Sequence, residues 1–315
     1  MSENAIEVEN LAKIYPGGVE AVRGISFEVA SGEVFGLLGP NGAGKSTTVG
    51  MMTTTIAPTD GNARLHGFDV ASEPLAARAL SSVVFQEAVV DRALTGRQHL
   101  AIHASLWRVE PREAQDRIAE LAASLHLTEL VNRPVGTYSG GERRRLEIAR
   151  ALVSHPRVLF LDEPTVGLDP RMRAELLDVI ATLRDTGETT ILLTTHYLDE
   201  AERLCDRLAI MHQGSVVALD RPAALRADLG DQIVELRTRD DATAALDLLR
   251  ELRIAGGDSF TVGATITIPL HERSAASVIA DIESAGVSTS AIAAREPTLD
   301  DVYLHLTGGQ LALAA

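Results

Sequence analysis

The feature that most constrains the fold is a glycine-rich loop between an apolar run and a helical pattern. Residues 34–38 are apolar, and a helical pattern continues after the loop to about Met52. The eight loop residues are Gly39, Pro40, Asn41, Gly42, Ala43, Gly44, Lys45 and Ser46. Glycines allow a backbone in which successive N–H groups turn inward toward an anion, and the helix adds the positive end of its dipole. The spacing G-x-x-x-x-G-K-S therefore predicts a strand–loop–helix unit that binds phosphate groups.

The lysine in this loop is notable because the chain hardly uses lysine. Of its 29 Lys and Arg residues, only Lys13 and Lys45 are lysines. Since arginine serves most surface roles equally well, a lysine kept here indicates a site that needs a compact ammonium group. We expect Lys45 to reach the β- and γ-phosphates of a nucleotide and the Ser46 hydroxyl to ligate Mg²⁺. The alternative is a glycine-rich turn that matches the spacing by coincidence.

Two carboxylates follow a second apolar run. Residues 158–161 have the pattern of a buried strand, and Asp162 and Glu163 come directly after them. Ligands of parallel α/β sheets bind at the carboxyl ends of the strands. We therefore expect Asp162 to hold Mg²⁺ through water and Glu163 to accept the proton of an attacking water. The alternative is a strand that ends in an ordinary solvated Asp-Glu pair.

A second anion-binding element lies between these two motifs. Ser139, Gly140 and Gly141 precede a helical pattern over residues 143–154. Backbone amides, a hydroxyl and a helix dipole therefore meet at one point. Two phosphate-binding elements in one chain suggest that two chains meet over the nucleotide. A guanine-nucleotide enzyme is disfavoured, because neither lysine stands in an Asn-Lys-x-Asp setting.

The composition argues against several other classes of protein. The 315 residues carry a formal net charge of −15, which repels phosphate backbones and disfavours general nucleic-acid binding. The single cysteine, Cys205, excludes an internal disulfide and fits a reducing compartment. No run of 18 apolar residues and no signal-peptide pattern occurs. We therefore expect a cytosolic chain that would need a partner to act on a membrane.

The order of the patterns predicts two domains. Strands alternate with helices over residues 1–225, which predicts an α/β domain with a parallel sheet. Within it, residues 95–155 have a mostly helical pattern, which opens with the capping-box spacing of Thr95 and Gln98. Residues 231–315 follow the order β-α-β-β-α-β, which predicts a small α+β, ferredoxin-like domain.

Taken together, these motifs resemble those of the ATP-binding subunit of an ABC transporter, over about residues 5–222. The glycine-rich loop resembles the Walker A motif, Asp162 and Glu163 close a Walker B motif, and Ser139-Gly140-Gly141 resembles the signature motif. The further matches are Tyr15 as the adenine-stacking aromatic, Gln86 as the Q-loop, Gly167-Leu168-Asp169 as the D-loop, and His196 as the switch histidine. Taken alone, Tyr15, Gln86 or His196 could equally be an ordinary structural residue.

The resemblance implies a P-loop ATPase core with an antiparallel β-subdomain and a helical insertion. It also implies a head-to-tail homodimer in which each ATP lies between the Walker A motif of one copy and the signature motif of the other. Within one copy, the implied ATP and Mg²⁺ ligands are Lys45, Ser46, Thr47, Gln86 and Asp162. The implied roles in hydrolysis are water activation by Glu163 and γ-phosphate contact by His196. Asp169 would cross the dimer interface, and Ser139 and Gly141 would serve the partner's nucleotide.

Two departures from the family pattern bear on these expectations. Glu142 stands where the signature motif has glutamine, and it would weaken ATP binding if it faced the phosphates. We expect it to point away, toward a nearby arginine. Three arginines follow, Arg143 to Arg145. An amphipathic helix with Leu146, Ala149 and Leu152 inward explains them better than a nucleic-acid surface does.

The resemblance extends to the drug- and antibiotic-export branch of the family. It rests there on Tyr138-Ser-Gly-Gly followed by three arginines, and on the tail Glu296-Pro-Thr-Leu-Asp-Asp-Val-Tyr-Leu. The implied protein is a peripheral subunit on the cytoplasmic face of the membrane, which energises a separate integral membrane permease. The second domain would be either regulatory or stabilising.

Two other functions compete with this one. The first is a soluble ABC ATPase that acts on ribosomes or DNA, although such proteins usually carry two ATPase modules or long coiled-coil arms. The second is a regulatory binder that does not hydrolyse ATP, against which the intact Glu163 and His196 argue.

Overall fold

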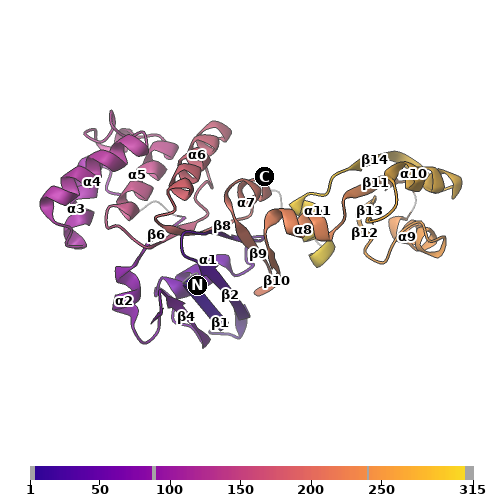
Figure 1. Ribbon diagram of the computed structural model, residues 1–315, viewed down its shortest axis with the longest axis horizontal. Coiled ribbons are helices and arrows are strands. Elements are labelled where there is room, and N and C mark those ends of the chain that lie inside the picture. Colours follow the sequence, from indigo (N-terminus) through magenta and orange to yellow (C-terminus); the bar gives the residue numbers. More distant parts are fainter. Residues whose placement is uncertain (1–3, 87–89, 240, 309–315) are drawn as a thin grey trace. The chain divides into compact units, whose positions relative to one another are not determined.

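The computed structural model describes residues 4–86, 90–239 and 241–308. The chain divides into two compact units, Met1–Val216 and Val217–Ala315. The division falls inside strand β10 (Ser215–Asp220), whereas the sequence analysis ended the first domain at residue 225. Figure 1 labels the elements along the chain.

The central sheet of the first unit has the strand order β10-β9-β3-β8-β7-β6. Its other strands are β3 (Val34–Leu38), β6 (Ser81–Val84), β7 (Val158–Asp162), β8 (Thr190–Thr195) and β9 (Arg207–His212). From β9 to β6 along this order, each pair of neighbouring strands runs parallel. Every residue of β3, β7 and β8 is buried, as expected of parallel strands covered on both faces.

The connections of this sheet are helices, which the parallel topology requires. Helix α1 (Lys45–Met52) follows β3, α6 (Pro170–Thr186) joins β7 to β8, and α7 (Leu198–Leu204) joins β8 to β9. Strand β8 lies between β3 and β7, with Leu38 opposite Thr195 and Asp162 opposite Thr194. The carboxyl ends of these three strands therefore meet at one edge of the sheet.

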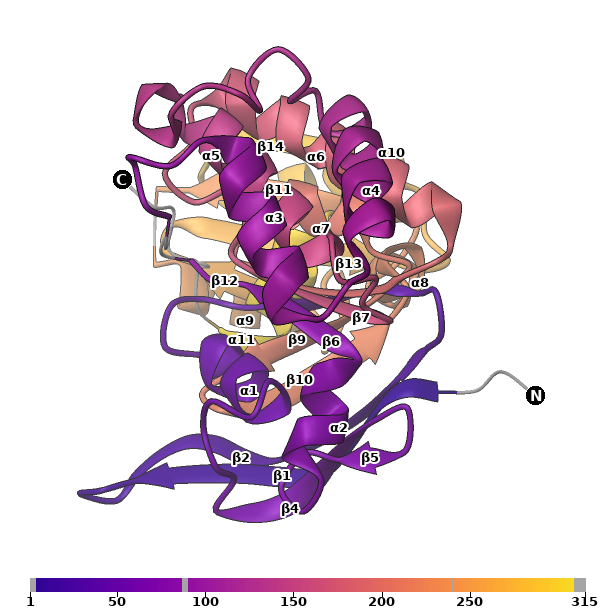
Figure 2. The same cartoon turned by 90° about the vertical axis from the view of Figure 1, so that its left-hand side faces the viewer.

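A second, antiparallel sheet of the first unit has the order β2-β1-β4-β5. Its strands are β1 (Asn4–Tyr15), β2 (Val19–Ala30), β4 (Asp60–Leu65) and β5 (Phe68–Asp69). The turn between β1 and β2 holds Gly17 and Gly18 at φ of 93° and 81°, a region that favours glycine. Helix α2 (Pro74–Ala79) follows β5. Figure 2 shows this sheet at the end of the unit opposite to helices α3–α5.

Those helices lie between β6 and β7 in the sequence. They are α3 (Gly96–Leu106), α4 (Pro111–Ser124) and α5 (Gly140–Leu152), with a short 3₁₀ turn at Val135–Thr137. The capping box predicted from Thr95 and Gln98 is present at the start of α3. Helix α4 buries Ala114, Ile118, Leu121 and Ala122, which share one helical face.

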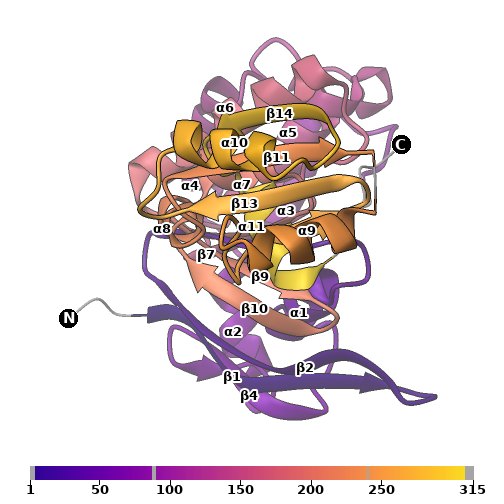
Figure 3. The same cartoon turned by 90° about the vertical axis from the view of Figure 1, so that its right-hand side faces the viewer.

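The second unit contains a four-stranded antiparallel sheet of order β12-β13-β11-β14. The strands are β11 (Gln232–Thr238), β12 (Phe260–Val262), β13 (Thr265–Leu270) and β14 (Thr289–Arg295). The helices are α8 (Pro222–Asp228), α9 (Ala242–Glu251), α10 (Ala275–Ser284) and α11 (Leu299–Thr307). Figure 3 shows strands β11, β13 and β14 of this sheet with helices α9 and α10. From β11 to β14 the observed order is β-α-β-β-α-β, as the sequence predicted.

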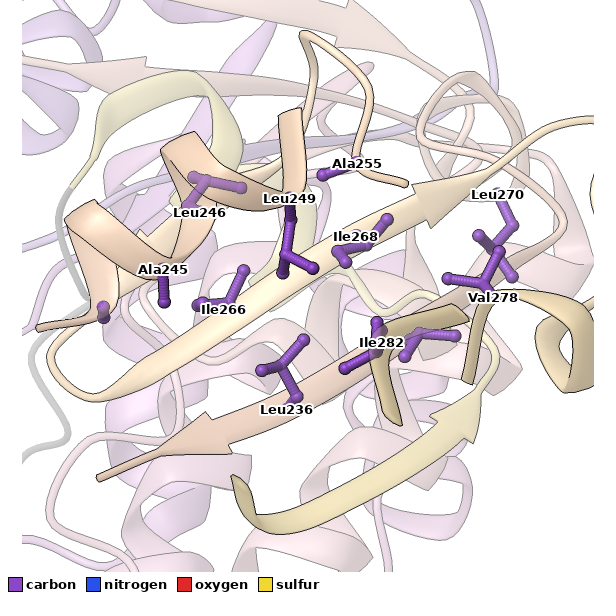
Figure 4. Close-up of a cluster of buried hydrophobic side chains, with 12 residues drawn as sticks. Leu236, Ala245, Leu246, Leu249, Ala255, Ile266, Ile268, Leu270, Val278 and Ile282 are labelled. Carbon is purple, nitrogen blue, oxygen red and sulfur yellow. The ribbon is translucent and has the colours of Figure 1, made fainter. Parts of the chain in front are cut away.

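Helices α9 and α10 pack against the same face of this sheet. Figure 4 shows Leu246 and Leu249 of α9 facing Ile266 and Ile268 of β13, with Ile282 of α10 beside β11. All of these side chains are at most 4% exposed. The unit therefore has a hydrophobic core of its own.

Helix α11 begins with a capping box that buries a carboxylate. Asp301 accepts hydrogen bonds from the backbone N–H of Thr298 and from two nitrogens of Arg295, and Arg295 also pairs with Glu235 at 2.8 Å. Burial alone would raise the pKa of Asp301. The hydrogen bonds from Arg295 and Thr298 outweigh burial, so the pKa of Asp301 lies below its usual value.

Helix α9 offers a test of this core with an internal control. Replacing Leu249, which is fully buried, by alanine should lower the free energy of unfolding by about 2–5 kcal/mol, because apolar contacts are lost and a cavity remains. The neighbouring Leu248 is 40% exposed, and its replacement by alanine should change that free energy by no more than about 0.5 kcal/mol. Urea unfolding of both variants measures the difference, and equal effects would contradict the packing described.

Candidate functional site

The glycine-rich loop joins β3 to α1 at the carboxyl edge of the central sheet. It borders a cleft of about 530 Å³. The cleft is lined by Tyr15, Val19, Glu20, Ala21, Asn41, Gly42, Gly44, Lys45, Ser46, Thr47, Gln86 and Glu163. Gly44 has φ of 105°, and a Cβ there would lie 2.5 Å from the carbonyl oxygen of Ala21, so this position requires glycine. The loop thus turns backbone amides and the start of α1 toward the cleft.

Lys45 is buried at the base of the cleft, with 4% of its surface exposed. Its Nζ donates to the carbonyl oxygens of Gly39 at 2.8 Å and Pro40 at 3.1 Å. The same nitrogen lies 3.1 Å from Oε1 of Glu163. The ammonium group is therefore held by three oxygens, one of them charged, at the end of a buried stem.

Asp162 and Ser46 meet beside this pair. The Ser46 hydroxyl donates to Oδ1 of Asp162 at 3.1 Å, and the Thr194 hydroxyl donates to the same oxygen at 2.6 Å. Thr194 Oγ1 also accepts from the backbone N–H of Glu163 at 2.9 Å. Since β8 lies between β3 and β7, Thr194 joins both acidic residues across the sheet.

Glu163 adopts a conformation that is rare for a non-glycine residue. Its φ is 44°, in the left-handed region, which costs of order 1–3 kcal/mol and persists only where the surroundings enforce it. Its carboxylate is approached by three side chains: Oε1 by Lys45, Oε2 by Gln86 Nε2 at 3.4 Å, and Oε1 by His196 Nδ1 at 3.5 Å. The structure thus brings the four residues together around one carboxylate.

His196 has two buried ring nitrogens, of which Nδ1 only approaches the Glu163 carboxylate. Within the described residues, neither ring nitrogen makes a hydrogen bond, although both nitrogens are buried. Buried polar groups of native proteins are nearly always hydrogen-bonded, so such a pair indicates a ligand position. The ring packs against that of Tyr197, with 4.1 Å between centroids.

A second carboxylate, Glu200, fixes the segment that carries His196. It is 1% exposed. The Thr195 hydroxyl donates to it at 2.7 Å, Arg173 Nε donates at 2.7 Å, and the Thr165 hydroxyl makes a further hydrogen bond. Arg173 also covers the Tyr197 ring at 3.9 Å. The loops that follow β7 and β8 are therefore tied to one buried group.

Tyr15 lies half-buried at the end of β1 and borders the cleft. Lys13 Nζ lies 5.3 Å from the centre of its ring, within the range of a cation–π contact. The antiparallel sheet therefore contributes an aromatic residue to the cleft.

The Ser139-Gly140-Gly141 element occupies the start of α5. Ser139 is the N-cap residue, and its hydroxyl accepts from the backbone N–H of Glu142 at 3.2 Å. Gly141 packs on Met172, where a Cβ would lie 3.0 Å from that side chain. Asp169 caps α6 and accepts from the N–H groups of Arg171 and Met172. None of the described residues that line the cleft comes from these two helix starts.

The expectation for Glu142 was partly wrong. Its carboxylate does not reach an arginine. It turns back and accepts from the backbone N–H of Ser139 at 2.6 Å, which completes a capping box. The three arginines that follow have internal partners: Arg143 donates to the Tyr138 carbonyl, Arg144 is buried, and Arg145 pairs with Glu175.

Comparison with known proteins identifies the family. A family model described as "ABC transporter" matches residues 22–166. The daunorubicin/doxorubicin resistance ATP-binding protein DrrA of Streptomyces peucetius is 41% identical over 310 residues, which cover 96% of this chain and 92% of that protein. The chain belongs to the ATP-binding proteins of ABC transporters. It is thus an ATPase subunit that couples ATP hydrolysis to transport.

Two further comparisons agree with this assignment. The linearmycin resistance ATP-binding protein LnrL of Bacillus subtilis is 34% identical, over 97% of this chain and 99% of that protein. A solved structure described as an ATP-binding subunit of an ABC transporter is 29% identical, with a TM-score of 0.64, and covers 71% of this chain. In the described part of this ABC ATPase, no helix is both long and apolar enough to span a membrane.

Sequence reasoning missed several residues that build the site. The sequence analysis gave Thr194, Glu200 and Arg144 no role in the site, although each is buried and holds a segment of the cleft edge. Thr194 read only as part of a β-branched strand, and Glu200 as an ordinary helical acid. A polar residue at a position where the strand or helix pattern requires burial is the one signal that could have identified them.

Thr194 allows a direct test of this arrangement. Replacing it by valine keeps the shape but removes the hydroxyl, which leaves the Glu163 N–H and Asp162 each short of a partner. We expect a loss of about 1–3 kcal/mol in the free energy of unfolding. Thr194→Ser, which keeps the hydroxyl, is the control. If the two variants are equally stable in urea unfolding, the hydroxyl does not join the strands as described.

Proposed function

We propose that this ABC ATPase energises the export of a drug, an antibiotic or another hydrophobic compound through a separate integral membrane permease. The observation that carries the hydrolytic part is the convergence of Lys45, Gln86 and His196 on the carboxylate of Glu163. The cargo class is supported by similarity over nearly the whole chain to proteins named for resistance to daunorubicin and linearmycin. The subunit would work at the cytoplasmic face of the membrane, bound to its permease.

ATP would enter the cleft with its phosphates on the glycine-rich loop. Backbone N–H groups between Asn41 and Thr47 would hold the phosphates, and Tyr15 would stack on the adenine. Lys45 would leave the carbonyl oxygens of the loop and the Glu163 carboxylate for the β- and γ-phosphates. This exchange replaces one negative partner of the ammonium by a more highly charged one.

The donor set beside the loop suits Mg²⁺. Ser46 and Asp162 present two oxygens 3.1 Å apart, and Gln86 adds an amide oxygen at the same end of the cleft. Oxygen ligands, with phosphate oxygens and water completing the shell, are those that Mg²⁺ prefers. When bound, the ion would neutralise phosphate charge. In its absence the Ser46 hydroxyl and Thr194 hold Asp162 in place.

In hydrolysis, Glu163 would accept the proton of the attacking water. Its carboxylate lies at the cleft wall, and the exchange of Lys45 to the phosphates leaves it free to accept that proton. A ring nitrogen of His196 that makes no hydrogen bond in the structure would donate to the γ-phosphate, which satisfies a buried donor. Gln86 would sense the γ-phosphate and the metal and report to the helical segment that begins at residue 95.

The second phosphate-binding element would act on the nucleotide of another copy. Ser139 and Asp169 are exposed at the starts of α5 and α6, away from the residues that line the cleft. The capping box uses Ser139 Oγ as an acceptor, which leaves its proton to donate to a phosphate. We therefore propose a head-to-tail homodimer, with Ser139, Gly140, Gly141 and Asp169 at the partner's ATP.

The second unit is proposed to be a ferredoxin-like accessory domain. The support is its element order and its four-stranded antiparallel sheet with both helices on one face. Its separate core suits either a regulatory or a stabilising role for the ATPase.

Glu163→Gln tests the general base. The amide keeps the size of the side chain but cannot take a proton, so ATP turnover should fall by about 10²–10⁴-fold while ATP binding remains. Asp178→Asn, a change of the same kind on exposed α6, is the control. Phosphate release measures turnover, and light scattering with excess ATP measures dimer formation. Together they distinguish a loss of turnover from a loss of ATP binding. Hydrolysis by Glu163→Gln at the parent rate would contradict the role.

Lys45→Ala tests the phosphate loop, with the chain's other lysine as control. Charge-assisted hydrogen bonds contribute about 1.5–3 kcal/mol, so ATP affinity should fall by at least about tenfold. Lys13→Ala removes an equal charge outside the loop; because Lys13 contacts the Tyr15 ring, it should weaken ATP binding slightly, but far less than Lys45→Ala does. Isothermal titration with ATP measures both, and equal affinities for the two variants would contradict the assignment.

A further inference from the structure

Arg144 is the buried residue among the three consecutive arginines at the start of α5. It contacts two backbone segments near the cleft, one at Phe85 and one at residues 162–164. It lies one turn into α5 and is 6% exposed. A guanidinium group carries five N–H donors in a rigid fork, and it cannot lose its charge in a protein. A buried arginine therefore needs an acceptor for every donor.

The structure supplies five acceptors. Nε donates to the Pro164 carbonyl at 2.8 Å, and Nη1 donates to the Phe85 carbonyl at 2.5 Å. Nη2 donates to the carbonyls of Asp162 at 3.2 Å and Glu163 at 3.5 Å. The fifth acceptor is the carboxylate of Glu147, which Nη1 meets at 3.0 Å. Glu147 is 3% exposed and balances the charge.

Four of these acceptors are backbone carbonyls that bear directly on the site. The carbonyls of Asp162 and Glu163 belong to the two peptide groups that flank the Glu163 Cα. Holding both groups constrains φ and ψ of Glu163, the residue with the strained φ of 44°. The carbonyl of Phe85 belongs to the peptide that leads into Gln86. One side chain therefore fixes the backbone of both residues whose side chains meet at 3.4 Å.

We infer that Arg144 is a positioning residue for ATP hydrolysis, which holds Glu163 in its strained conformation and aligns Gln86 with it. The inference rests on the proposed role of Glu163. Arg144 stands on the helix that begins with Ser139, so a displacement of α5 moves the guanidinium and, through it, the peptides around Glu163. The helix start that is proposed to meet the partner's nucleotide is thus linked to the hydrolytic carboxylate of its own copy.

The alternative role is a purely structural one, in which the Arg144–Glu147 pair only fastens α5 to the sheet. The two roles differ in what a conservative change does. Arg144→Lys keeps the positive charge and the pairing with Glu147, but it offers three donors in place of five. If the pair only attaches α5 to the sheet, its role would survive this change. The alignment of the four carbonyls would be lost.

The experiment compares Arg144→Lys with the parent and with Arg145→Lys. Arg145 is the adjacent arginine and pairs with Glu175 on α6, outside the cleft. We expect Arg144→Lys to bind ATP within about threefold of the parent, because the residues that line the cleft are intact. Its turnover number should fall by about 10–100-fold, the effect of a reacting group misplaced by about 1 Å. Arg145→Lys should match the parent in both.

A second measurement shows whether Arg144 acts through Glu163. In the Glu163→Gln background, the change of Arg144 to lysine should lower the residual single-turnover rate by less than about twofold, because residues that act as one unit are not additive. A full multiplication of the two effects would overturn the inference.

The remaining outcomes are equally distinct. An Arg144→Lys variant that turns over ATP at the parent rate overturns the inference and leaves the roles of Lys45 and Glu163 intact. If Arg144→Lys loses ATP binding, turnover and thermal stability in parallel, Arg144 has a structural role only, and the inference is also overturned. If the Glu163→Gln variant turns over ATP at the parent rate, that result contradicts the proposed function itself, and the inference with it.

Discussion

The buried ion pair between Lys45 and Glu163 is the interaction on which the site depends. Taking two charges out of water is costly unless further hydrogen bonds compensate. Here the ammonium group has two carbonyl oxygens as additional partners, and the carboxylate has Gln86. The pair joins the loop after β3 to the end of β7 and defines the base of the cleft. In the proposed binding mode, phosphate groups would compete for the same ammonium, so that nucleotide binding and the release of Glu163 would be one event.

The sheet topology makes this pair possible. Lys45 and Glu163 are far apart in the sequence, and β8 separates their strands. Thr194 of β8 fixes the β7 side of this arrangement, because its hydroxyl meets both Asp162 and the Glu163 backbone. Glu200 accepts hydrogen bonds from Thr165, Arg173 and Thr195, next to His196. Arg144 of α5 donates to the backbone carbonyls of Phe85, Asp162 and Pro164. The hydrolytic residues are therefore supported by buried polar groups from three different segments.

Most of the residues that meet at the cleft could be predicted from the sequence because their motifs are local. The loop needs glycine at fixed spacings, and the acidic pair directly follows an apolar run. The contacts that orient these groups could not be predicted. Arg144, for example, is distant in the sequence from Phe85 and Pro164 and contacts them only once the sheet has folded. The partner of Glu142 was misassigned for a different reason. Charge attraction to the neighbouring arginines was weighed, while the Ser-x-x-Glu spacing, which forms a capping box, was not applied there.

The same distinction holds for the second unit. Its strand and helix order followed from periodicity, since each element is short and separated by turn residues. The Arg295 contacts to Glu235 and Asp301 were not evident, because they join residues on separate elements. The sequence predicts a first domain over residues 1–225, and the compact units divide within β10.

The structure of the chain with ATP and Mg²⁺ bound, in the Glu163→Gln variant, tests the central claim most directly. The account predicts that Lys45 Nζ leaves the carbonyl oxygens of Gly39 and Pro40 and contacts the β- and γ-phosphates, with Tyr15 against the adenine. An ATP molecule bound in the cleft while Lys45 keeps its present partners, or one bound elsewhere on the chain, would contradict it.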